Sequence, residues 1–464
     1  MARVSMNKSE NSMDFPQVHP LLLSLIPTSL IIYKFVALIF KNMNTKQKMK
    51  MKKLSITLMM GLICGITYGQ ENNFKQYLAN NQENIDLEGT DSWKILKQDA
   101  EKNQLIILGE SHGAQNAQLI DFNLLKYLNK TVGTKKYIAE LDYAQAEKIN
   151  DYLKTGNEKP LKEVFKFLVS IHAQWGNQDF YNKIVKIRSL NQTLTKDKKI
   201  KFIGIDVVQD HSGYLKFIQK LTKNQKNPLL DSLNLMINKS YDPANVDEIS
   251  SFAKNYSKKI NQNKTAFKTM LKSEFSLFKY LITNLSYGDK SVGVNRPEGI
   301  YQNFTQLSNI LNFGNQKMYG MWGFFHAHLV PFKYIGGDFV SKLSDSENPI
   351  AKKITSIICL PIDSKYNVWD SKTNEWKAMP FSYDDKSLFL VDGIEDLKEL
   401  STPYSTTLFK LNSKDSPFLK SGRLLNGTAP RGKLVADFKN SDYGNQYIIL
   451  MRNSDWLNPL PKDF

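Results

Sequence analysis

Residues 105–113 read LIILGESHG, and this stretch decides the fold class. Its first four residues form a continuous apolar run, which ends at a glycine and a group of polar residues. Three further runs have the same layout, at 136–144 (KYIAELDYA), 201–210 (KFIGIDVVQD) and 318–329 (MYGMWGFFHAHL). Short apolar runs bounded by turn signals are typical of buried parallel strands. We therefore expect residues 105–108 to form the first strand of a parallel sheet.

Amphipathic helical periods lie between these runs, over residues 114–128, 145–153 and 180–190. Strands that alternate with helices predict an α/β fold with a central, mainly parallel sheet flanked by helices. From about residue 212 to residue 290 the helical periods continue without a strand. We expect this segment to be a helical insertion or cap, and residues 70–464 to form one domain.

Residues 51–69 have the features of a signal peptide: two lysines, an apolar run and small residues before Gln70. Residues 1–50 are then either an over-extended start or a marginal membrane anchor, because a proline and a lysine interrupt the apolar run at 21–40. We expect a mature protein that begins at Gln70, in the periplasm or secreted. After cleavage we expect no stable membrane insertion.

The net charge of +17 does not predict a nucleic-acid partner. The lysines are scattered, and no RNP, zinc-finger or helix-turn-helix pattern accompanies them, so a solvated basic surface is the simpler interpretation. Of the two cysteines, Cys64 lies in the signal peptide and Cys359 in an apolar run. The mature chain therefore has no cysteine pair for an intrachain disulfide, and we expect Cys359 to be buried in the core.

All four apolar runs end in ionisable residues. Ligands of open α/β sheets bind beyond the carboxyl ends of the strands, so we expect these side chains to meet in one crevice. Acids and histidines held together there can exchange protons with a substrate. The residues are Glu110, His112, Glu140, Asp142, Asp206, His326 and His328.

Two geometric expectations follow for this crevice. Consecutive strands are often neighbours, so the strand at 136–139 should pair with the strand at 105–108 and bring Glu140 beside His112. His326 and His328 should alternate on a strand and point to opposite faces, so that one of them faces the site.

Gly109 to Gly113 also match the G-x-S-x-G nucleophile elbow, which offers Ser111, Asp206 and His328 as a catalytic triad. An elbow serine follows a central strand, with several strands and an oxyanion loop before it. The run at 105–108 comes early in the mature chain, and no HGGG-like motif precedes it. We therefore favour a loop or N-cap role for Ser111.

A series of short motifs follows in a fixed order between residues 100 and 330. They are Gly109–Gly113, Tyr137–Glu140, Ile149–Gly156, Trp175, Arg188–Asn191, Gly204–Asp206, Arg296 with Asn303, and Phe324–His328. Through these motifs the chain resembles the erythromycin esterase family and, more loosely, the wider group that includes ChaN-like and Tiki-like proteins. Two features depart from the family pattern. A single residue separates Glu110 from His112 where the family has two, and Phe325 and His326 occupy the places of a histidine and an asparagine.

The resemblance implies a hydrolase that cleaves an ester, or a lactone or amide, of a small-molecule substrate. Water would be the nucleophile, His112 the general base, and Glu110 or Glu140 the residue that orients it. Arg188 and His328 would stabilise the oxyanion. The resemblance assigns substrate binding to Asp206, Trp175, Arg296 and His326.

The closer esterase relatives imply that no cofactor is needed. A divalent metal is the alternative, held by Glu110, His112, Glu140 and His328 as nitrogen and oxygen ligands. The looser relatives suggest two other functions, a ChaN-like haem- or metal-binding protein and a metal-dependent Tiki-like peptidase.

Overall fold

The computed structural model describes residues 73–89, 92–239, 246–439 and 441–464. Asn73–Phe464 forms one compact unit. The predicted signal peptide, start site and anchor lie outside the described residues. Within the described ranges, every helix is too short or too polar to cross a bilayer.

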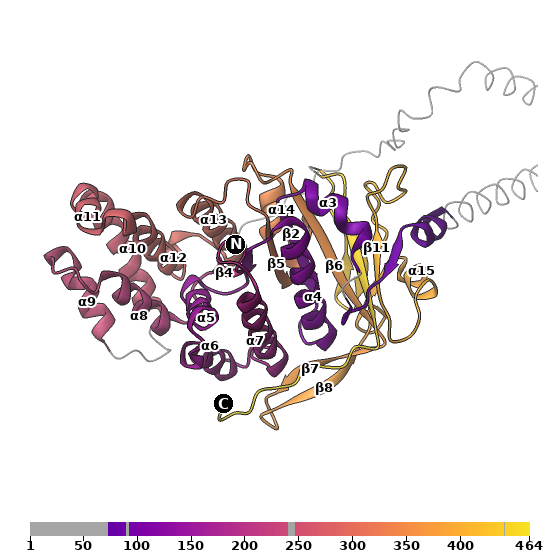
Figure 1. Ribbon diagram of the computed structural model, residues 1–464, viewed down its shortest axis with the longest axis horizontal. Helices are drawn as coiled ribbons and strands as arrows, with labels where there is room; N and C mark the ends of the chain where they lie inside the picture. Colours follow the sequence, from indigo (N-terminus) through magenta and orange to yellow (C-terminus); the bar gives the residue numbers. More distant parts are fainter. Residues whose placement is uncertain (1–72, 90–91, 240–245, 440) are drawn as a thin grey trace, which may run out of the picture. The chain divides into compact units, whose positions relative to one another are not determined.

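An eight-stranded sheet lies at the centre of this unit, and it confirms the predicted α/β class (Figure 1). In spatial order its strands are β1 (Gln82–Asn84), β11 (Thr406–Lys410), β14 (Tyr447–Arg452), β6 (Ile354–Ile362), β2 (Leu105–Glu110), β5 (Met318–Gly323), β3 (Lys136–Ala139) and β4 (Lys201–Gly204). The strands from β14 to β4 are parallel, and β1 and β11 add an antiparallel edge.

Two smaller sheets accompany the central one. One is the hairpin of β7 (Ser364–Asp370) and β8 (Glu375–Phe381). The other contains β13 (Gly432–Leu434), β12 (Gly427–Ala429), β10 (Phe389–Val391) and β9 (Asp384–Asp385).

The order of the central strands corrects two expectations: that the run at 105–108 does not form a central strand, and that it pairs with the run at 136–139. β2 is the first parallel strand along the chain, but it lies in the middle of the sheet between β6 and β5. β5 also separates β2 from β3, since Met318 is in register with both Leu105 and Lys136. The expected pairing of 105–108 with 136–139 is therefore wrong, because a strand from much later in the chain inserts between them.

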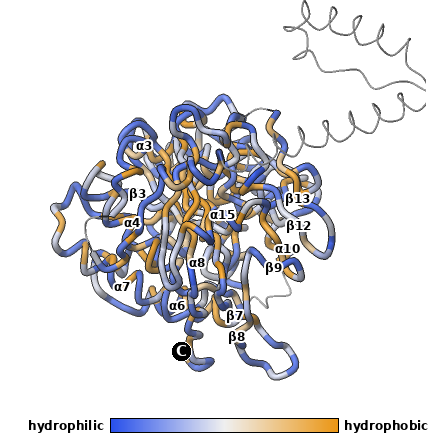
Figure 2. Tube along the Cα trace, turned by 90° about the vertical axis from the view of Figure 1, so that its right-hand side faces the viewer, coloured by the Kyte–Doolittle hydropathy of each residue, from blue (hydrophilic) through white to orange (hydrophobic). Residues whose placement is uncertain are grey.

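Side chains of β2 alternate between two hydrophobic cores, one on each face of the sheet. Ile106 and Leu108 pack in one core and Leu105 and Ile107 in the other, as a buried strand requires. Figure 2 shows hydrophobic segments gathered inside and hydrophilic segments around them. The first core includes residues from α3 (Lys97–Lys102), α4 (Gln115–Val132), α5 (Tyr143–Thr155), α6 (Glu158–Ser170) and α7 (Gln178–Thr193). The second includes residues from α13 (Arg296–Ile310), α14 (Phe339–Ser344) and α15 (Ile394–Glu399).

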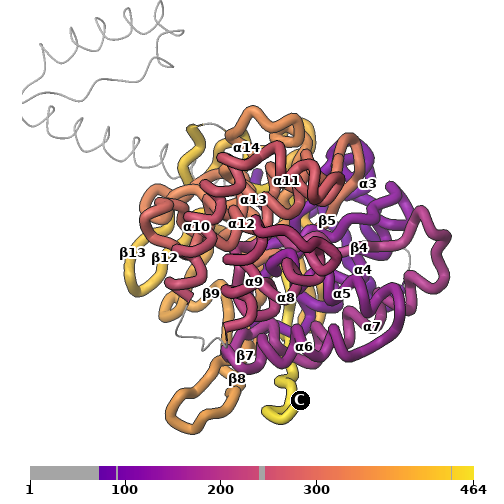
Figure 3. Tube along the Cα trace, turned by 90° about the vertical axis from the view of Figure 1, so that its left-hand side faces the viewer, coloured from indigo at the N-terminus to yellow at the C-terminus, as the bar shows by residue number. Residues whose placement is uncertain are grey.

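A group of helices without strands occupies the chain between β4 and α13. Its members are α8 (His211–Thr222), α9 (Asp231–Asn238), α10 (Val246–Gln262), α11 (Lys264–Leu271) and α12 (Phe275–Ser286). Figures 1 and 3 show them together at the β4 end of the sheet. Their apolar faces belong to the second core, which continues into this group.

Candidate active site

The carboxyl ends of β2, β5, β3 and β4 lie side by side at one edge of the sheet, because these strands are parallel neighbours. Glu110 is the last residue of β2, Glu140 directly follows β3, and Asp206 follows β4. His326 lies in a 3-10 helix, η7 (Phe324–Ala327), that continues from β5. The fold therefore brings together four residues that are far apart in the sequence.

His112 and Glu110 form a hydrogen-bonded pair at the end of β2, through Nδ1 of the imidazole and Oε1 of the carboxylate. The other ring nitrogen, Nε2, has no hydrogen-bond partner in the described part of the chain. Nε2 lies beside Gly323, where a Cβ atom would stand 2.9 Å from it, so only a glycine leaves room for the ring. Burial disfavours the charged imidazole, but Glu110 and, more weakly, Glu140 raise the pKa of His112 to about 9.

A cavity of about 50 Å³ lies beside this pair. Its volume suits a few water-sized groups, since a cavity needs roughly 10–15 Å³ of this measure to hold one water. The ring of Trp175 lies 5.1 Å from the ring of His112. The cavity is lined by Glu110, His112, Gln118, Tyr137, Ala139, Glu140, Leu141, Trp175, Phe180, Lys183, Met321 and Trp322.

Arg296, the first residue of α13, links the loops that follow β3, β4 and β5. Its Nε and Nη2 donate to the two carboxylate oxygens of Asp206 at 3.0 and 2.6 Å, and Asp206 is 0% exposed. Nη2 also donates to Oε1 of Glu140 at 2.7 Å, and Nη1 lies 3.1 Å from Nε2 of His326. The arginine side chain remains 40% exposed, so part of it is open to a ligand.

Glu140 is held from two sides. Its Oε2 accepts the backbone N–H of Gly323 at 2.7 Å, while its Oε1 faces Arg296 and His326. Burial opposes its charge, but His326, His112 and Arg296 together keep the pKa of Glu140 well below its usual range. Glu140 and His112 line the same cavity and interact through their charges, yet the carboxylate bonded to His112 is Glu110. The expected direct partnership of Glu140 with His112 is therefore corrected.

His326 completes the cluster through Asp338, a residue that the sequence analysis missed. Its Nδ1 lies 2.7 Å from Oδ1 of Asp338, and its Nε2 lies 3.3 Å from Oε1 of Glu140. Burial opposes protonation, but these two carboxylates raise the pKa of His326 to about 9. Asp338 also caps α14 by accepting the N–H of Phe339 at 2.6 Å, so the recognisable signal in the sequence was an acid directly before a helix.

The expectation that His326 and His328 alternate on a strand is wrong, because β5 ends at Gly323 and the chain continues as η7. His328 lies just beyond η7 and is 2% exposed, with its ring 4.6 Å from that of Phe324 and 5.0 Å from that of Phe332. Neither of its nitrogens has a hydrogen-bond partner among the described residues. Burial lowers the pKa of His328 to about 3, so it is a neutral core residue outside the cavity.

Arg188 also lies away from the cavity. Its guanidinium packs against Gly156 and sits 5.8 Å from the ring centre of Tyr152. A different cation of the same helix, Lys183, lines the cavity instead. Five helical residues correspond to a rotation of about 140°, which explains why Arg188 and Lys183 point in different directions. Lys183 interrupts the apolar stripe of its helix, and this is the sequence signal that could have identified it.

The structure does not assemble the serine triad. The Oγ atom of Ser111 lies 2.6 Å from the hydroxyl of Tyr383, and both residues are buried. Asp206 is engaged by Arg296, and His328 packs between phenylalanines. An elbow serine follows a central strand, and β2 does lie in the centre of the sheet, so the place of Ser111 does not argue against an elbow. However, Ser111 has no histidine partner in the described residues.

The metal ligand set inferred from the sequence does not come together either. Across the described ranges, no group of three or more histidine, cysteine, aspartate or glutamate side chains is arranged to hold a metal ion. His112 and Glu110 bond to each other, and His328 lies outside the cavity. The residues present therefore do not fit the proposed metal site.

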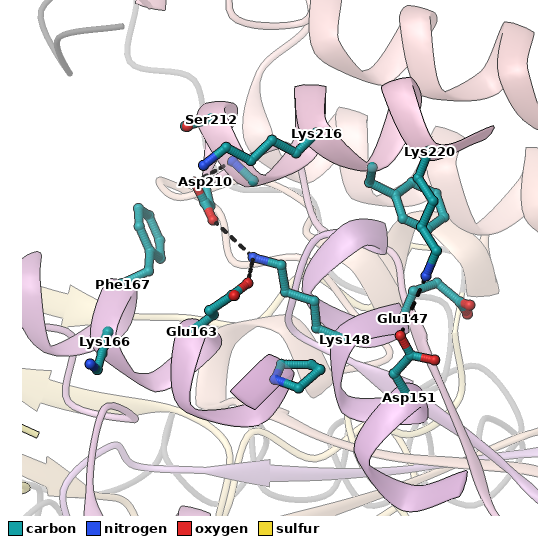
Figure 4. Close-up of a pocket in the computed structure, with 13 residues that line it drawn as sticks. Glu147, Lys148, Asp151, Glu163, Lys166, Phe167, Asp210, Ser212, Lys216 and Lys220 are labelled. Atoms are coloured by element: carbon teal, nitrogen blue, oxygen red, sulfur yellow. Dashed lines mark hydrogen bonds and ion pairs between the residues drawn. The ribbon is translucent and has the colours of Figure 1, made fainter. Parts of the chain in front are cut away.

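A larger cleft of about 580 Å³ lies between α5, α6 and α8 (Figure 4). Lys148 pairs there with Glu163 at 3.3 Å and with Asp210 at 3.8 Å. Its lining contains no histidine and none of the residues predicted for the site. The cleft thus lacks the histidines and the acids that follow the parallel strands, so we place the chemistry in the small cavity.

No family model and no curated protein match the chain. Three solved structures have a similar fold. A protein from Bacillus cereus has a TM-score of 0.64 and 16% identity, covering 84% of this chain and 99% of its own. A succinoglycan biosynthesis protein has a TM-score of 0.61 and 14% identity, with coverages of 84% and 99%. A histidine-to-asparagine variant of the erythromycin esterase EreC in its open conformation has a TM-score of 0.60 and 11% identity, with coverages of 80% and 98%. The chain thus has the α/β fold seen in an erythromycin esterase.

Proposed function

We propose that this protein is a hydrolase that cleaves an ester, or a lactone or amide, of a small molecule by activating water. The observation that carries the proposal is the His112–Glu110 pair: His112 lines a cavity with room for water, and its Nε2 has no hydrogen-bond partner among the residues that the structure describes. The fold shared with an erythromycin esterase supports a hydrolase-like function.

The pair has the geometry of a general base. With its Nδ1 proton held by Glu110, the neutral imidazole carries its lone pair on Nε2. Nε2 takes a proton from water while the water oxygen attacks the carbonyl carbon, and the charged imidazole is stabilised by Glu110. The proton then passes to the leaving alcohol as the C–O bond breaks, which leaves an acid and an alcohol.

The neighbouring charged cluster suits substrate binding. Arg296 and His326 are fixed by Asp206 and Asp338, so a substrate meets groups that are already oriented. Glu140 adds negative charge near His112 and favours its protonated form in the transition state. The cavity holds little more than the reacting groups, so the bulk of a substrate must lie outside it.

A panel of p-nitrophenyl esters tests this function directly. Purified wild-type protein should hydrolyse at least one ester, and His112→Ala should be inactive. Activity should survive chelation, because in the proposed mechanism His112 and Glu110 activate water without a metal. A wild-type protein that hydrolyses no ester but gives a Soret band on haem titration would favour the haem-binding alternative.

Export to the periplasm or medium is part of the proposal, and it rests on residues 51–69. N-terminal sequencing of the protein from its native host should find Gln70 first. A product that retains residues 1–50 would contradict this location.

A further inference from the structure

The cavity beside His112 has a buried cation that the general-base mechanism does not use. Lys183 of α7 lines it and is 3% exposed, and its ammonium forms an ion pair with Asp121 of α4, which is 0% exposed. The hydroxyl of Tyr137 donates to the same oxygen of Asp121 at 2.7 Å. A buried ion pair costs so much desolvation that an apolar pair of similar size is often at least as stable. Fold stability alone therefore gives no reason for a lysine at this position.

The ammonium of Lys183 has hydrogen-bonding capacity to spare. It carries three N–H donors, and Asp121 is the hydrogen-bond acceptor that the described residues offer it. The ammonium nitrogen also lies 4.5 Å from the ring centre of Phe180 and 5.7 Å from that of Tyr137. Aromatic faces stabilise the charge of the ammonium, but they do not accept hydrogen bonds from its remaining N–H groups as an oxygen atom would.

A second donor lines the same cavity. The indole Nε1 of Trp175 is buried and has no hydrogen-bond partner in the described part of the chain. Buried donors are normally paired, so an unpaired one at a cavity wall indicates a group that binds there. Because the cavity measures only about 50 Å³, one small acceptor inside it is within reach of its polar walls.

We propose that Lys183 and Trp175 bind the carbonyl oxygen of the substrate and stabilise it as an oxyanion. The inference rests on the proposed hydrolase function and assigns the role that the sequence analysis gave to Arg188 and His328. When water adds to the carbonyl, the C=O electron pair moves onto this oxygen, and both donors bond more strongly to the anion than to the neutral carbonyl. Asp121 balances the charge of Lys183, so the free cavity carries no uncompensated cation.

Charge-neutral substitution tests this assignment. Lys183→Met combined with Asp121→Asn removes the cation without leaving a buried unpaired acid. Trp175→Phe keeps an aromatic ring but removes the N–H. Each variant should lower kcat by about 10²–10³-fold with little change in KM, as loss of one oxyanion donor does. Lys186→Met, on the exposed side of the same helix, should keep the wild-type kcat.

The affinity for a tetrahedral phosphonate monoester, an analogue of the best ester substrate, separates oxyanion binding from a structural role. If Lys183 and Trp175 only supported the fold, their substitution would not change this affinity. The Kd of the phosphonate, measured by calorimetry, should rise in proportion to the loss of kcat/KM in the two site variants. Variants that keep the wild-type kcat and phosphonate affinity, while His112→Ala is inactive, would overturn the oxyanion assignment and leave the general base intact. A wild-type protein that hydrolyses no ester would instead overturn the proposed function, and this assignment with it.

Discussion

Glu110 and His112, two residues apart at the end of β2, are joined by a hydrogen bond between carboxylate and imidazole. Glu110 is the last residue of β2 and His112 lies in the turn that directly follows it, so a single intervening residue is enough for this turn to bring the imidazole onto the carboxylate. The chain departs from the family pattern at this spacing. The departure therefore fits a directly bonded acid–histidine pair.

The pH dependence of hydrolysis should report this pair. His112 must be neutral to accept a proton, and its pKa is raised to about 9, so kcat/KM should increase with pH up to about that value. Glu110→Gln removes the main cause of the raised pKa. The acid limb of the profile should then move to lower pH, while the maximum falls by about 10²–10⁴-fold. An acid limb that stays in place in the variant would mean that another group titrates.

Ser111→Ala should keep most of the activity. The substitution removes the hydrogen bond to Tyr383 and leaves a buried hydroxyl unpaired, which should cost about 1–3 kcal/mol of unfolding free energy. Serine-directed fluorophosphonates should not label the protein. Stoichiometric labelling of Ser111 would restore the elbow mechanism.

The two late histidines should respond differently to substitution. His328→Phe should keep turnover because His328 lies among aromatic rings outside the cavity. His326→Ala should lose activity because it breaks contacts with Arg296 and Asp338. Activity assays on purified variants check this, and an inactive, folded His328→Phe would return His328 to the site.

His328→Phe should also reduce the acid sensitivity of the fold. The folded pKa of His328 is about 3 and the unfolded value about 6.5, so below pH 6.5 the unfolded chain binds a proton that the native chain does not. The resulting stability loss reaches about 2 kcal/mol at pH 5 and is absent in the variant. His112 and His326, whose pKa values are raised, lose their contributions only as the pH rises toward 9, and they do so equally in both proteins. Tm measurements at pH 7.5 and 5 give the comparison.

Arg296→Met should lower the free energy of unfolding more than Lys220→Met, which removes an exposed cation. Arg296→Met removes the cation that pairs with the buried carboxylate of Asp206, and we expect a loss of about 1–3 kcal/mol in unfolding free energy, less than for a fully buried pair because Arg296 is partly exposed. Lys220→Met breaks the exposed pair with Asp151 and should cost about 0–1 kcal/mol. Equal losses for the two variants, measured by urea unfolding, would contradict the role of Arg296 as a link between loops.

The sequence predicted the fold class and the acids that follow β2, β3 and β4, because short apolar runs that end in polar residues indicate both, but it did not predict where β5 ends. It did not predict strand order, since nothing local in residues 318–323 indicates insertion between β2 and β3. The positions of Glu110, His112, Glu140, Asp206 and His326 at one edge follow from parallel strands. The position of His328 depends on where β5 ends, and the position of Arg188 depends on which face of α7 it occupies. Matching short motifs determines neither of these. Lys183 and Asp121 were missed because the lysine within the apolar stripe of α7 was not read as a signal, and its partner lies on another helix.

A double-mutant cycle on Glu110 and His112 tests the central claim most directly. If the two residues activate water as one unit, Glu110→Gln combined with His112→Ala should lower kcat/KM of the best p-nitrophenyl ester hardly more than His112→Ala alone. The same cycle with Glu140→Gln in place of Glu110→Gln provides the comparison, because Glu140 acts on His112 through its charge without a direct hydrogen bond. Losses for Glu110 and His112 that multiply fully in the double variant would show that they work separately, and the general-base pair would be contradicted.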